Sequence, residues 1–432
     1  MKRTLYSKLL EWKNRDERKP LILNGARQVG KTYLLQEFGQ KEYQKMAFFS
    51  LDRHPMAAHV FETGGSAAEI LLSLSAISNV DITPGDTLVV LDEVQDCPKA
   101  LEALKYFCEE TPDFHVVVAG SLLGLSLHDG VSYPVGKVEE LQLYPMTFIE
   151  FLEAAGKERM AEVLQSGNWS VINMLGDEYI KLLRQYYYVG GMPAAVLAFV
   201  EQKGLLTVRS VQKQILRDYR RDFSKHAPER EVPRIHMVWD SIPSQLAKEN
   251  KKFIYGAVKK SSRAAEFELA IQWLVDAGLV YKVMRANSVK VPLKFYEDLN
   301  AFKLFMLDVG LMGAMTDTSS ETMFVSNRVF TEYKGAFTEL YVLTQLRTLN
   351  LPIYYYSVSN STIELDFLLQ YADKVWPIEV KAENNVHAKS LRTFIANNPH
   401  LKGLRFSMLP YQPQDWMINI PLYACLNVTH ID

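Results

Sequence analysis

Residues 25–32 read Gly-Ala-Arg-Gln-Val-Gly-Lys-Thr, with apolar residues 21–23 before them and a helical pattern over residues 33–38 after them. Glycine lets backbone N–H groups come close to phosphate oxygens, and the N-terminus of a following helix favours negative charge. The spacing therefore predicts a phosphate-binding loop for ATP, in which Lys31 meets the β- and γ-phosphates and the Thr32 hydroxyl holds Mg²⁺. The predicted nucleotide-binding residues are Gly25, Ala26, Arg27, Gln28, Val29, Gly30, Lys31, Thr32 and Tyr33.

A second apolar strand, residues 88–91, ends in Asp92 and Glu93. Asp92 is expected to hold Mg²⁺ through water, and Glu93 is placed to polarise an attacking water. The adjacent acids favour hydrolysis over a simple switch. A third apolar strand leads to Ser121, which either senses the γ-phosphate and orients the water or is an ordinary turn residue.

A second set of acids lies near the C-terminus, where "WPIEVKAENN" reads as a strand. Glu379 and Lys381 point to one face of it, and Ile378 and Val380 to the other. The expected order is a helix with Glu339, a strand, a strand with Glu364 and Asp366 on one face, and then this strand. Either a salt-bridged surface strand or a metal-dependent nuclease would explain the pattern.

The segments "LNGARQVGKT", "VVLDEVQ", "VVVAGSLLG" and "LQLYPMTFIEFL" resemble a family of prokaryotic AAA-type ATPases. Members pair an N-terminal ATPase with a C-terminal domain of unknown function numbered 4143, and the resemblance covers nearly the whole chain. It implies a P-loop ATPase with a parallel sheet of the additional-strand class, so that Lys31, Glu93 and Ser121 are the expected catalytic residues.

The order of acids near the C-terminus resembles the core of restriction-endonuclease-like enzymes. By this resemblance Glu339, Asp366 and Glu379 would be metal ligands, and Lys381 would be the catalytic lysine. Leu365 stands where the usual pattern has proline, and Glu364 is a rival ligand. The same fold also occurs without activity, so the site either cuts a phosphodiester or only keeps the fold.

Between these parts, residues 235–246 and 267–275 have helical spacing, and residues 279–287 and 290–298 read as two strands. This order resembles a winged helix, as the family resemblance also implies. Its basic residues fit either phosphate contacts or a solvated face, and they are Lys248, Lys251, Lys252, Lys259, Lys260 and Arg263. An arginine finger could come from Arg27 or from Arg217, Arg220 and Arg221, unless the latter form a solvated helix face with Asp218 and Asp222.

The whole chain sets the outer limits. Its 432 residues are 48% apolar and 23% charged, and the net charge of -2 excludes a uniformly basic nucleic-acid binder. No run approaches the roughly 20 apolar residues of a membrane span, no signal peptide is recognised, and three scattered cysteines favour a reduced, cytoplasmic protein.

We therefore predict an α/β protein with three modules: an ATPase with a helical appendage (1–205), a winged-helix region (206–298) and a restriction-endonuclease-like domain (299–432). Its function is either ATP hydrolysis coupled to a nucleic-acid-directed, nuclease-like module, or a nucleotide-gated switch that binds a protein partner through an inactive nuclease-like domain. ATP and Mg²⁺ are the expected cofactors, DNA and protein partners are both left open, and so is oligomerisation.

Overall fold

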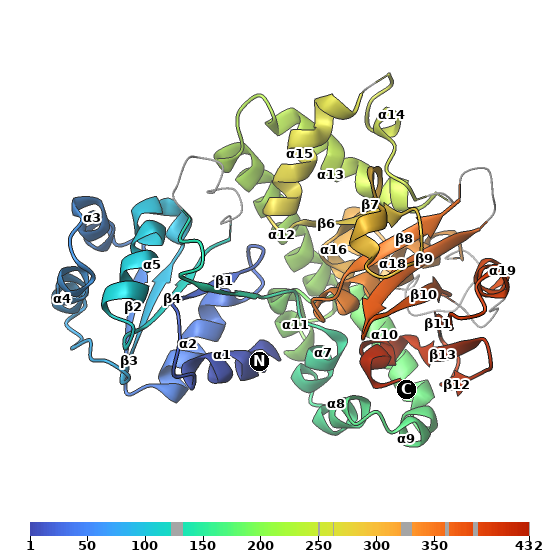
Figure 1. Cartoon of the computed structure of the whole chain (residues 1–432), viewed down its shortest axis with the longest axis horizontal. Helices are drawn as coiled ribbons and strands as arrows, with labels where there is room; N and C mark the ends of the chain where they lie inside the picture. The colour runs from blue at the N-terminus through green and yellow to red at the C-terminus, as the bar shows by residue number, and fades with distance from the viewer. Residues whose placement is uncertain are drawn as a thin grey trace. The chain divides into compact units, whose positions relative to one another are not determined.

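The computed structural model describes residues 1–121, 133–248, 251–261, 263–320, 331–358, 363–382 and 388–431. The chain divides into two compact units (Figure 1). The N-terminal unit comprises residues 2–144 and 276–279, and the C-terminal unit comprises Met1 and residues 145–275 and 280–432. The division into three modules at residues 205 and 298 stays a prediction.

The N-terminal unit is built on a parallel sheet with the strand order β2-β3-β4-β1-β5. Strand β4 lies between β1 and β3 and pairs in parallel with both, which confirms the additional-strand arrangement. The strands are β1 (Leu21–Asn24), β2 (Lys45–Ser50), β3 (Thr87–Asp92), β4 (His115–Ala119) and β5 (Glu139–Gln142). The helices are α1 (Leu5–Lys13), α2 (Lys31–Glu42), α3 (Pro55–Thr63), α4 (Ala67–Ser78), η1 (Val94–Asp96) and α5 (Pro98–Glu110).

The central strands are apolar because helices cover both faces of this sheet. Every residue of β3 and β4 is buried, as expected for parallel strands between helical layers. Phe49, Val89 and Val118 pack in one core with apolar side chains of α3, α4 and α5. Polar groups are therefore confined to the ends of the strands, and the carboxyl ends meet at one edge.

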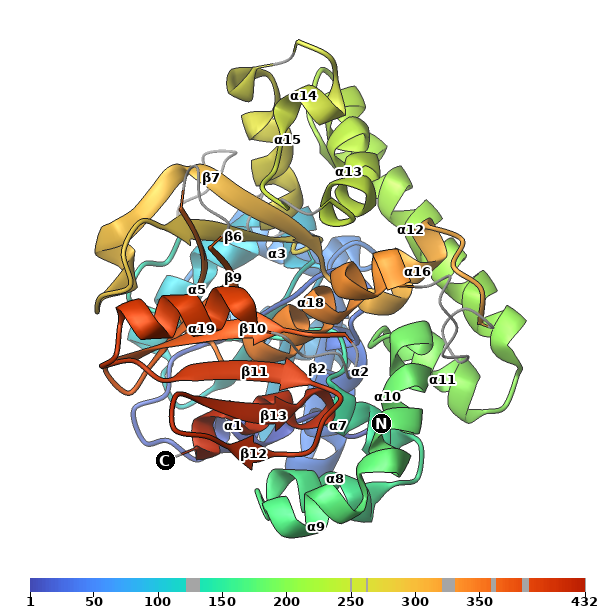
Figure 2. The same cartoon turned by 90° about the vertical axis from the view of Figure 1, so that its right-hand side faces the viewer.

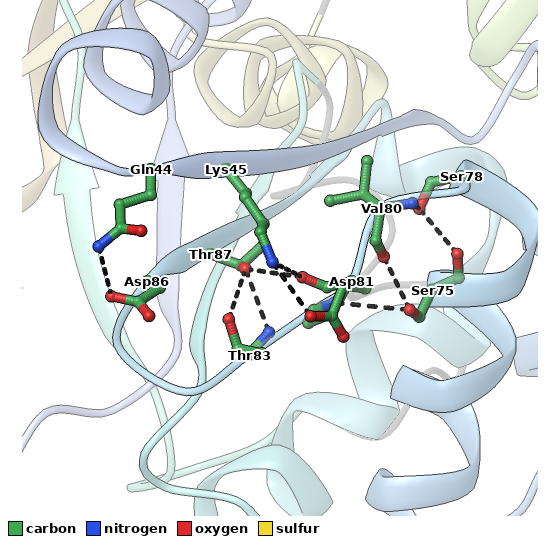
Figure 3. Close-up of polar contacts among 10 residues, drawn as sticks. Gln44, Lys45, Ser75, Ser78, Val80, Asp81, Thr83, Asp86 and Thr87 are labelled. Atoms are coloured by element: carbon green, nitrogen blue, oxygen red, sulfur yellow. Dashed lines mark hydrogen bonds and ion pairs between the residues drawn. The ribbon is translucent and has the colours of Figure 1, made fainter.

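The opposite edge is held by a polar network around the connection from α4 to β3 (Figure 3). The Lys45 ammonium lies 3.1 Å from an Asp81 carboxylate oxygen, and the Thr83 N–H donates to the Thr87 hydroxyl oxygen at 3.1 Å. These contacts hold the amino ends of β2 and β3 together. The register runs from Lys45 opposite Thr87 to Ser50 opposite Asp92, so it delivers Asp92 to the carboxyl edge.

The C-terminal unit contains a mixed sheet with the strand order β12-β13-β11-β10-β9-β8-β6-β7 (Figure 2). Its strands are β6 (Val280–Ala286), β7 (Glu297–Met306), β8 (Ile353–Ser357), β9 (Glu364–Tyr371), β10 (Lys374–Val380), β11 (Gly403–Ser407), β12 (Gln412–Pro413) and β13 (Met417–Pro421). Its longer helices are α10 (Gly176–Val189), α12 (Leu205–His226), α13 (Val232–Leu246), α15 (Ala264–Asp276), α18 (Thr331–Arg347) and α19 (Lys389–Asn397). Shorter helical elements are α7 (Phe148–Ala154), α8 (Glu158–Gln165), α9 (Trp169–Met174), α11 (Pro193–Val200), α14 (Tyr255–Val258), η3 (Leu293–Tyr296), α16 (Val309–Met315) and η5 (Leu422–His430).

The expected order of helix, strand, strand, strand is present as α18, β8, β9 and β10. The expected pair of wing strands is different. The second strand is β7, Glu297–Met306, whereas the sequence pattern predicts residues 290–298; Pro292 has no N–H to donate to a ladder, and η3 follows it. Strand β6 pairs in parallel with β8 at Arg285 and Tyr355, so the β6–β7 hairpin extends the C-terminal sheet (Figure 2). Among the described residues, no helix has the length and apolar character to span a bilayer.

A buried carboxylate, Asp308, holds the start of α16 to the turn after α10. It accepts the Gly191 N–H at 2.6 Å and, as the cap of α16, the Leu311 N–H at 2.8 Å. Gly190 passes next to it with φ 71° and ψ -168°, a conformation largely confined to glycine. A Cβ at Gly190 would lie 2.3 Å from an Asp308 carboxylate oxygen, so this close approach needs glycine.

Gly190→Ala should lower the free energy of unfolding of this unit by roughly 3 kcal/mol or more, because backbone strain adds to the clash with Asp308. Gly156→Ala is the matched control, since Gly156 has φ 72° but a Cβ added there would meet nothing within 4 Å. It should cost about 1–2 kcal/mol from backbone strain. Urea denaturation of both variants measures the difference in the free energy of unfolding. Equal losses in the two variants would show that the Asp308 carboxylate moves aside at little energetic cost.

Candidate functional site

The phosphate loop connects β1 to α2 at the carboxyl edge of the N-terminal sheet. Its backbone has positive φ at Gly25 (155°), Gln28 (65°) and Gly30 (96°). A Cβ at Gly25 would lie 2.5 Å from the Leu143 carbonyl oxygen, which explains why the sequence has glycine there. The turn thus wraps back on itself immediately before α2, where free helical N–H groups can meet an anion.

Arg3 supports this loop, although no sequence motif points to it. Its guanidinium is buried and donates to the Val29 carbonyl at 2.8 Å and to the Tyr144 carbonyl at 2.5 Å. These acceptors are 26 and 141 residues away in the chain. Only the tertiary structure brings these two carbonyls to Arg3. The sequence alone therefore does not distinguish this buried arginine from a solvent-exposed one.

The structure brings Lys31, Thr32 and Asp92 together at the base of the loop. The Lys31 ammonium donates to the carbonyls of Gly25 (2.7 Å) and Ala26 (2.9 Å), and burial lowers its pKa to about 8 against the opposing pull of the Glu93 and Asp92 carboxylates. The Thr32 hydroxyl donates to Asp92 Oδ2 at 2.6 Å. Burial raises the pKa of Asp92, and the hydrogen bond from Thr32 opposes that shift. A hydroxyl and a carboxylate are thus paired at the base of the loop.

Glu93 leaves β3 in a left-handed conformation, with φ 54° and ψ 44°, which is uncommon outside glycine. Its N–H donates to Asp92 Oδ1 at 3.1 Å, and its Oε2 accepts the Gln95 side-chain amide at 2.6 Å. The Ser121 hydroxyl lies 3.5 Å from the same oxygen. The structure therefore brings together Glu93 and Ser121, and adds Gln95, which the sequence motifs do not single out. Residues 122–132, which include the last three residues of the "GSLLG" segment, lie outside the described residues.

The other loop residues differ in exposure. Ala26 and Val29 are buried and shape the turn, whereas Gln28 is exposed and Arg27 is half-buried. Tyr33 is 56% exposed, so a ligand could reach its ring from the solvent side. Of the predicted loop residues, Lys31 interacts electrostatically with Asp92 and Glu93, and Thr32 forms a hydrogen bond with Asp92.

The predicted C-terminal acids also come together. Glu339 lies on α18, Asp366 on β9 and Glu379 on β10, and the three carboxylates interact electrostatically. Asp366 Oδ2 accepts the Val380 N–H at 2.7 Å. Burial, followed by the nearby Asp366 carboxylate, raises the pKa of Glu339 and of Glu379 to about 7.

Glu339, Glu379 and the rival ligand Glu364 each contact a lysine. Lys381 Nζ lies 2.5 Å from Glu379 Oε1, and the fully buried Lys303 Nζ lies 2.8 Å from Glu364 Oε1. Lys251 forms a close ion pair with Glu339. Within the described ranges, no group of three or more His, Cys, Asp or Glu side chains is arranged to hold a metal.

The arginines considered as fingers have side-chain partners. Arg217 donates to Gln214 at 2.7 Å, Arg221 lies 3.3 Å from Asp218, and Arg220 pairs with Asp240. In the basic stretch, Lys259, Lys260 and Arg263 are exposed, as expected for a surface that meets solvent or phosphates. Lys251 differs from them, because its side chain is only 13% exposed.

Three protein families match the chain in succession. Residues 17–152 match an AAA domain, residues 180–322 a domain of unknown function (DUF8612), and residues 334–423 a domain of unknown function (DUF4143). No curated protein matches. Among solved structures, the Walker-type ATPase PABY2304 of Pyrococcus abyssi is 14% identical, with 73% of this chain and 95% of that chain covered and a TM-score of 0.46.

The Orc1 protein of Aeropyrum pernix, solved in complex with DNA, is 15% identical, with 73% and 90% of the two chains covered and a TM-score of 0.27. Both TM-scores are too low to support an argument about function. The family matches, in contrast, coincide with the phosphate loop and with the C-terminal acids, and they confirm the resemblance found in the sequence. The chain joins an AAA-type P-loop ATPase domain at its N-terminus to a DUF4143 domain at its C-terminus.

Proposed function

We propose that this protein binds ATP together with Mg²⁺ and hydrolyses the bond between the β- and γ-phosphates, giving ADP and phosphate, with Glu93 as the base. The observation that carries the proposal is the arrangement at the ends of β1 and β3. The Thr32 hydroxyl and the Asp92 carboxylate are 2.6 Å apart, and the next residue, Glu93, is oriented by the Gln95 amide. A metal-binding pair and a directed carboxylate stand side by side, as hydrolysis of a nucleotide requires.

In this mechanism the loop N–H groups and the α2 N-terminus bind the phosphates. Lys31, which donates to two loop carbonyls, exchanges these acceptors for phosphate oxygens of higher charge. Glu93 accepts a proton from the attacking water, and Ser121, close to the same carboxylate, helps to orient that water. Asp92 accepts the Thr32 hydroxyl, whereas Glu93 accepts the Gln95 amide, so the two acids can serve different roles.

The residues present also fit magnesium. This cation prefers oxygen ligands and usually retains several waters, and Thr32 and Asp92 supply a hydroxyl and a buried carboxylate. When bound with ATP, magnesium neutralises charge on the β- and γ-phosphates.

Thr32→Val tests the proposal because it removes the hydroxyl and keeps the shape of the side chain. Mg²⁺-dependent release of phosphate from ATP should fall by about 10- to 100-fold, the range expected when an outer-sphere or ligand contact is lost. Thr63→Val, at the exposed end of α3, is the matched control and should leave the rate unchanged. Phosphate release that needs no Mg²⁺, or that Thr32→Val leaves intact, would contradict the proposal.

For the C-terminal unit, the ion pairs favour the nucleotide-gated switch over a coupled nuclease. Lys251 and Lys381 lie against Glu339 and Glu379, two of the three acids that cleavage would need as metal ligands. We therefore propose that ATP controls a partner-binding state of the protein, with the nuclease-like site held in a charge-paired form. DNA binding by the exposed residues Lys259, Lys260 and Arg263 stays a prediction.

A further inference from the structure

Seven ionisable side chains are gathered in the C-terminal unit around the middle of α18, the start of β9 and the end of β10. Three of the seven are deeply buried: side-chain exposure is 5% for Glu339, 8% for Glu379 and 0% for Lys303. The electrostatic contacts link every member to at least one other across the group. The members are the acids Glu339, Glu364, Asp366 and Glu379 and the lysines Lys251, Lys303 and Lys381.

The lysines supply most of the positive charge that such a cluster requires. Buried carboxylates are costly unless a cation or several donors compensate them. Glu339, Glu364 and Glu379 each have one ammonium as a partner, and Asp366 accepts a backbone N–H instead. In many proteins with carboxylates grouped in this way, a divalent cation takes this role.

Lys251 differs from the other two lysines in its origin. Lys303 and Lys381 are carried by, or follow directly on, strands β7 and β10 of the sheet itself. Lys251 belongs to the segment between α13 and α14, which reaches the cluster from outside the sheet. If one lysine can leave without unfolding the sheet, it is Lys251.

This segment, residues 251–255, docks beside β7 through backbone hydrogen bonds and aromatic packing that includes Tyr255 on Phe302. The Phe253 N–H donates to the Phe302 carbonyl at 2.8 Å, and the two rings are stacked at 5.4 Å. The Ile254 N–H donates to Gln245 Oε1 at 2.7 Å. Lys251 therefore ends a short docked stretch whose attachment depends on contacts next to β7 and on the ion pair with Glu339.

Two carboxylate oxygens in the cluster have no hydrogen-bond partner among the residues that the structure describes. They are Oε2 of Glu339 and Oε2 of Glu379, and both residues are more than nine-tenths buried. These two oxygens belong to different elements, α18 and β10. The charge of the Asp366 carboxylate acts on both groups. Unpaired, buried carboxylate oxygens are suitable ligands for a hard divalent cation.

We propose that Lys251 is a built-in cation of this cluster, and that a docked segment 251–255 and a divalent cation at Glu339 and Glu379 exclude each other. With Lys251 in place, its ammonium neutralises Glu339 and keeps the cluster free of metal. When the segment leaves, the same carboxylates take up Mg²⁺ or Mn²⁺. The segment and the cation thus define two states of the C-terminal unit, a proposal that does not depend on the ATPase activity.

Lys251→Met tests this directly, because methionine keeps the apolar stem and removes the charge. The probe is MnCl₂, with free Mn²⁺ measured by electron paramagnetic resonance. All chains carry Asp92→Asn to remove metal binding at the nucleotide site. Lys251→Met should bind one Mn²⁺ at least about 10-fold more tightly than the otherwise unchanged chain, since one cation replaces another.

Two matched variants separate this effect from a general change of charge. Lys260→Met removes an exposed lysine near the same segment and should leave Mn²⁺ affinity unchanged. Adding Glu339→Gln to Lys251→Met should abolish the gain. An unchanged affinity in Lys251→Met, an equal gain in Lys260→Met, or a gain that survives Glu339→Gln would overturn the proposal.

A second measurement covers the case in which Lys251→Met does not fold. In the chain with Lys251 intact, millimolar MnCl₂ should displace the segment and speed hydrogen exchange at the Phe253 and Ile254 amides. Exchange at amides in β9 and β10 should stay constant or slow. Protection of the Phe253 amide that does not change at saturating Mn²⁺ would overturn the proposal.

Discussion

Glu93→Gln should bind ATP normally and hydrolyse it at least about 100-fold more slowly, the loss expected when a general base is removed. Glutamine has the same shape and can still accept the hydrogen bond from Gln95, but its amide cannot take a proton from water. The phosphate contacts belong to the loop and to Lys31, so binding should be spared. Single-turnover phosphate release and equilibrium binding of labelled ATP measure the two quantities separately.

Asp96→Asn is the control for this variant, because it removes one exposed negative charge three residues away. It should hydrolyse ATP at the unchanged rate. If Glu93→Gln also keeps its full rate, the base lies elsewhere, and the hydrogen bond from Gln95 only fixes the turn after β3.

Lys31→Ala should weaken ATP binding by at least about 100-fold, the range for removing one partner of a buried charge pair. Lys31 is 8% exposed, and its ammonium donates to two carbonyls of the loop, so its removal leaves the phosphates without this buried charge. Alanine is the best helix former, so α2 should still begin at this position. Binding of a fluorescent ATP analogue measures the effect, and circular dichroism checks the fold.

Lys41→Ala serves as the matched control, since Lys41 is on the same helix, carries the same charge and is 61% exposed. It should bind ATP as tightly as the unchanged chain. Comparable weakening in both variants would mean that the general positive charge of α2, and not a specific contact of Lys31, attracts the nucleotide.

The ATPase part could be predicted from the sequence because its signals are local. Glycines, the lysine and the threonine are fixed by the geometry of one turn, and Asp92 and Glu93 follow directly on an apolar strand. Arg3 and Gln95 were missed for different reasons. Arg3 donates to carbonyls that are far away in the chain. Gln95 is neutral, and its hydrogen bond to Glu93 depends on the backbone conformation at Glu93.

In the C-terminal unit, the sequence predicts the acids of the cluster but not the lysines that pair with them. Glu339, Asp366 and Glu379 stand in a recognisable order, whereas Lys303 lies in the buried half of β7 and no sequence motif points to it. The sequence pattern groups Lys251 with neighbouring lysines, as phosphate contacts or as a solvated face. A run of basic residues does not show which one faces inward, because that depends on how the segment packs against β7.

Strands β6 and β7 belong to the C-terminal sheet, so they limit where the chain can be cut into a stable fragment. A fragment cut at residue 299 would lose β6, and β8 would become an open edge with unpaired N–H and C=O groups. Strand β7 would keep its apolar residues and lose its antiparallel partner. Such a piece is expected to associate with other copies of itself, edge to edge, and a fragment beginning before Val280 avoids this hazard.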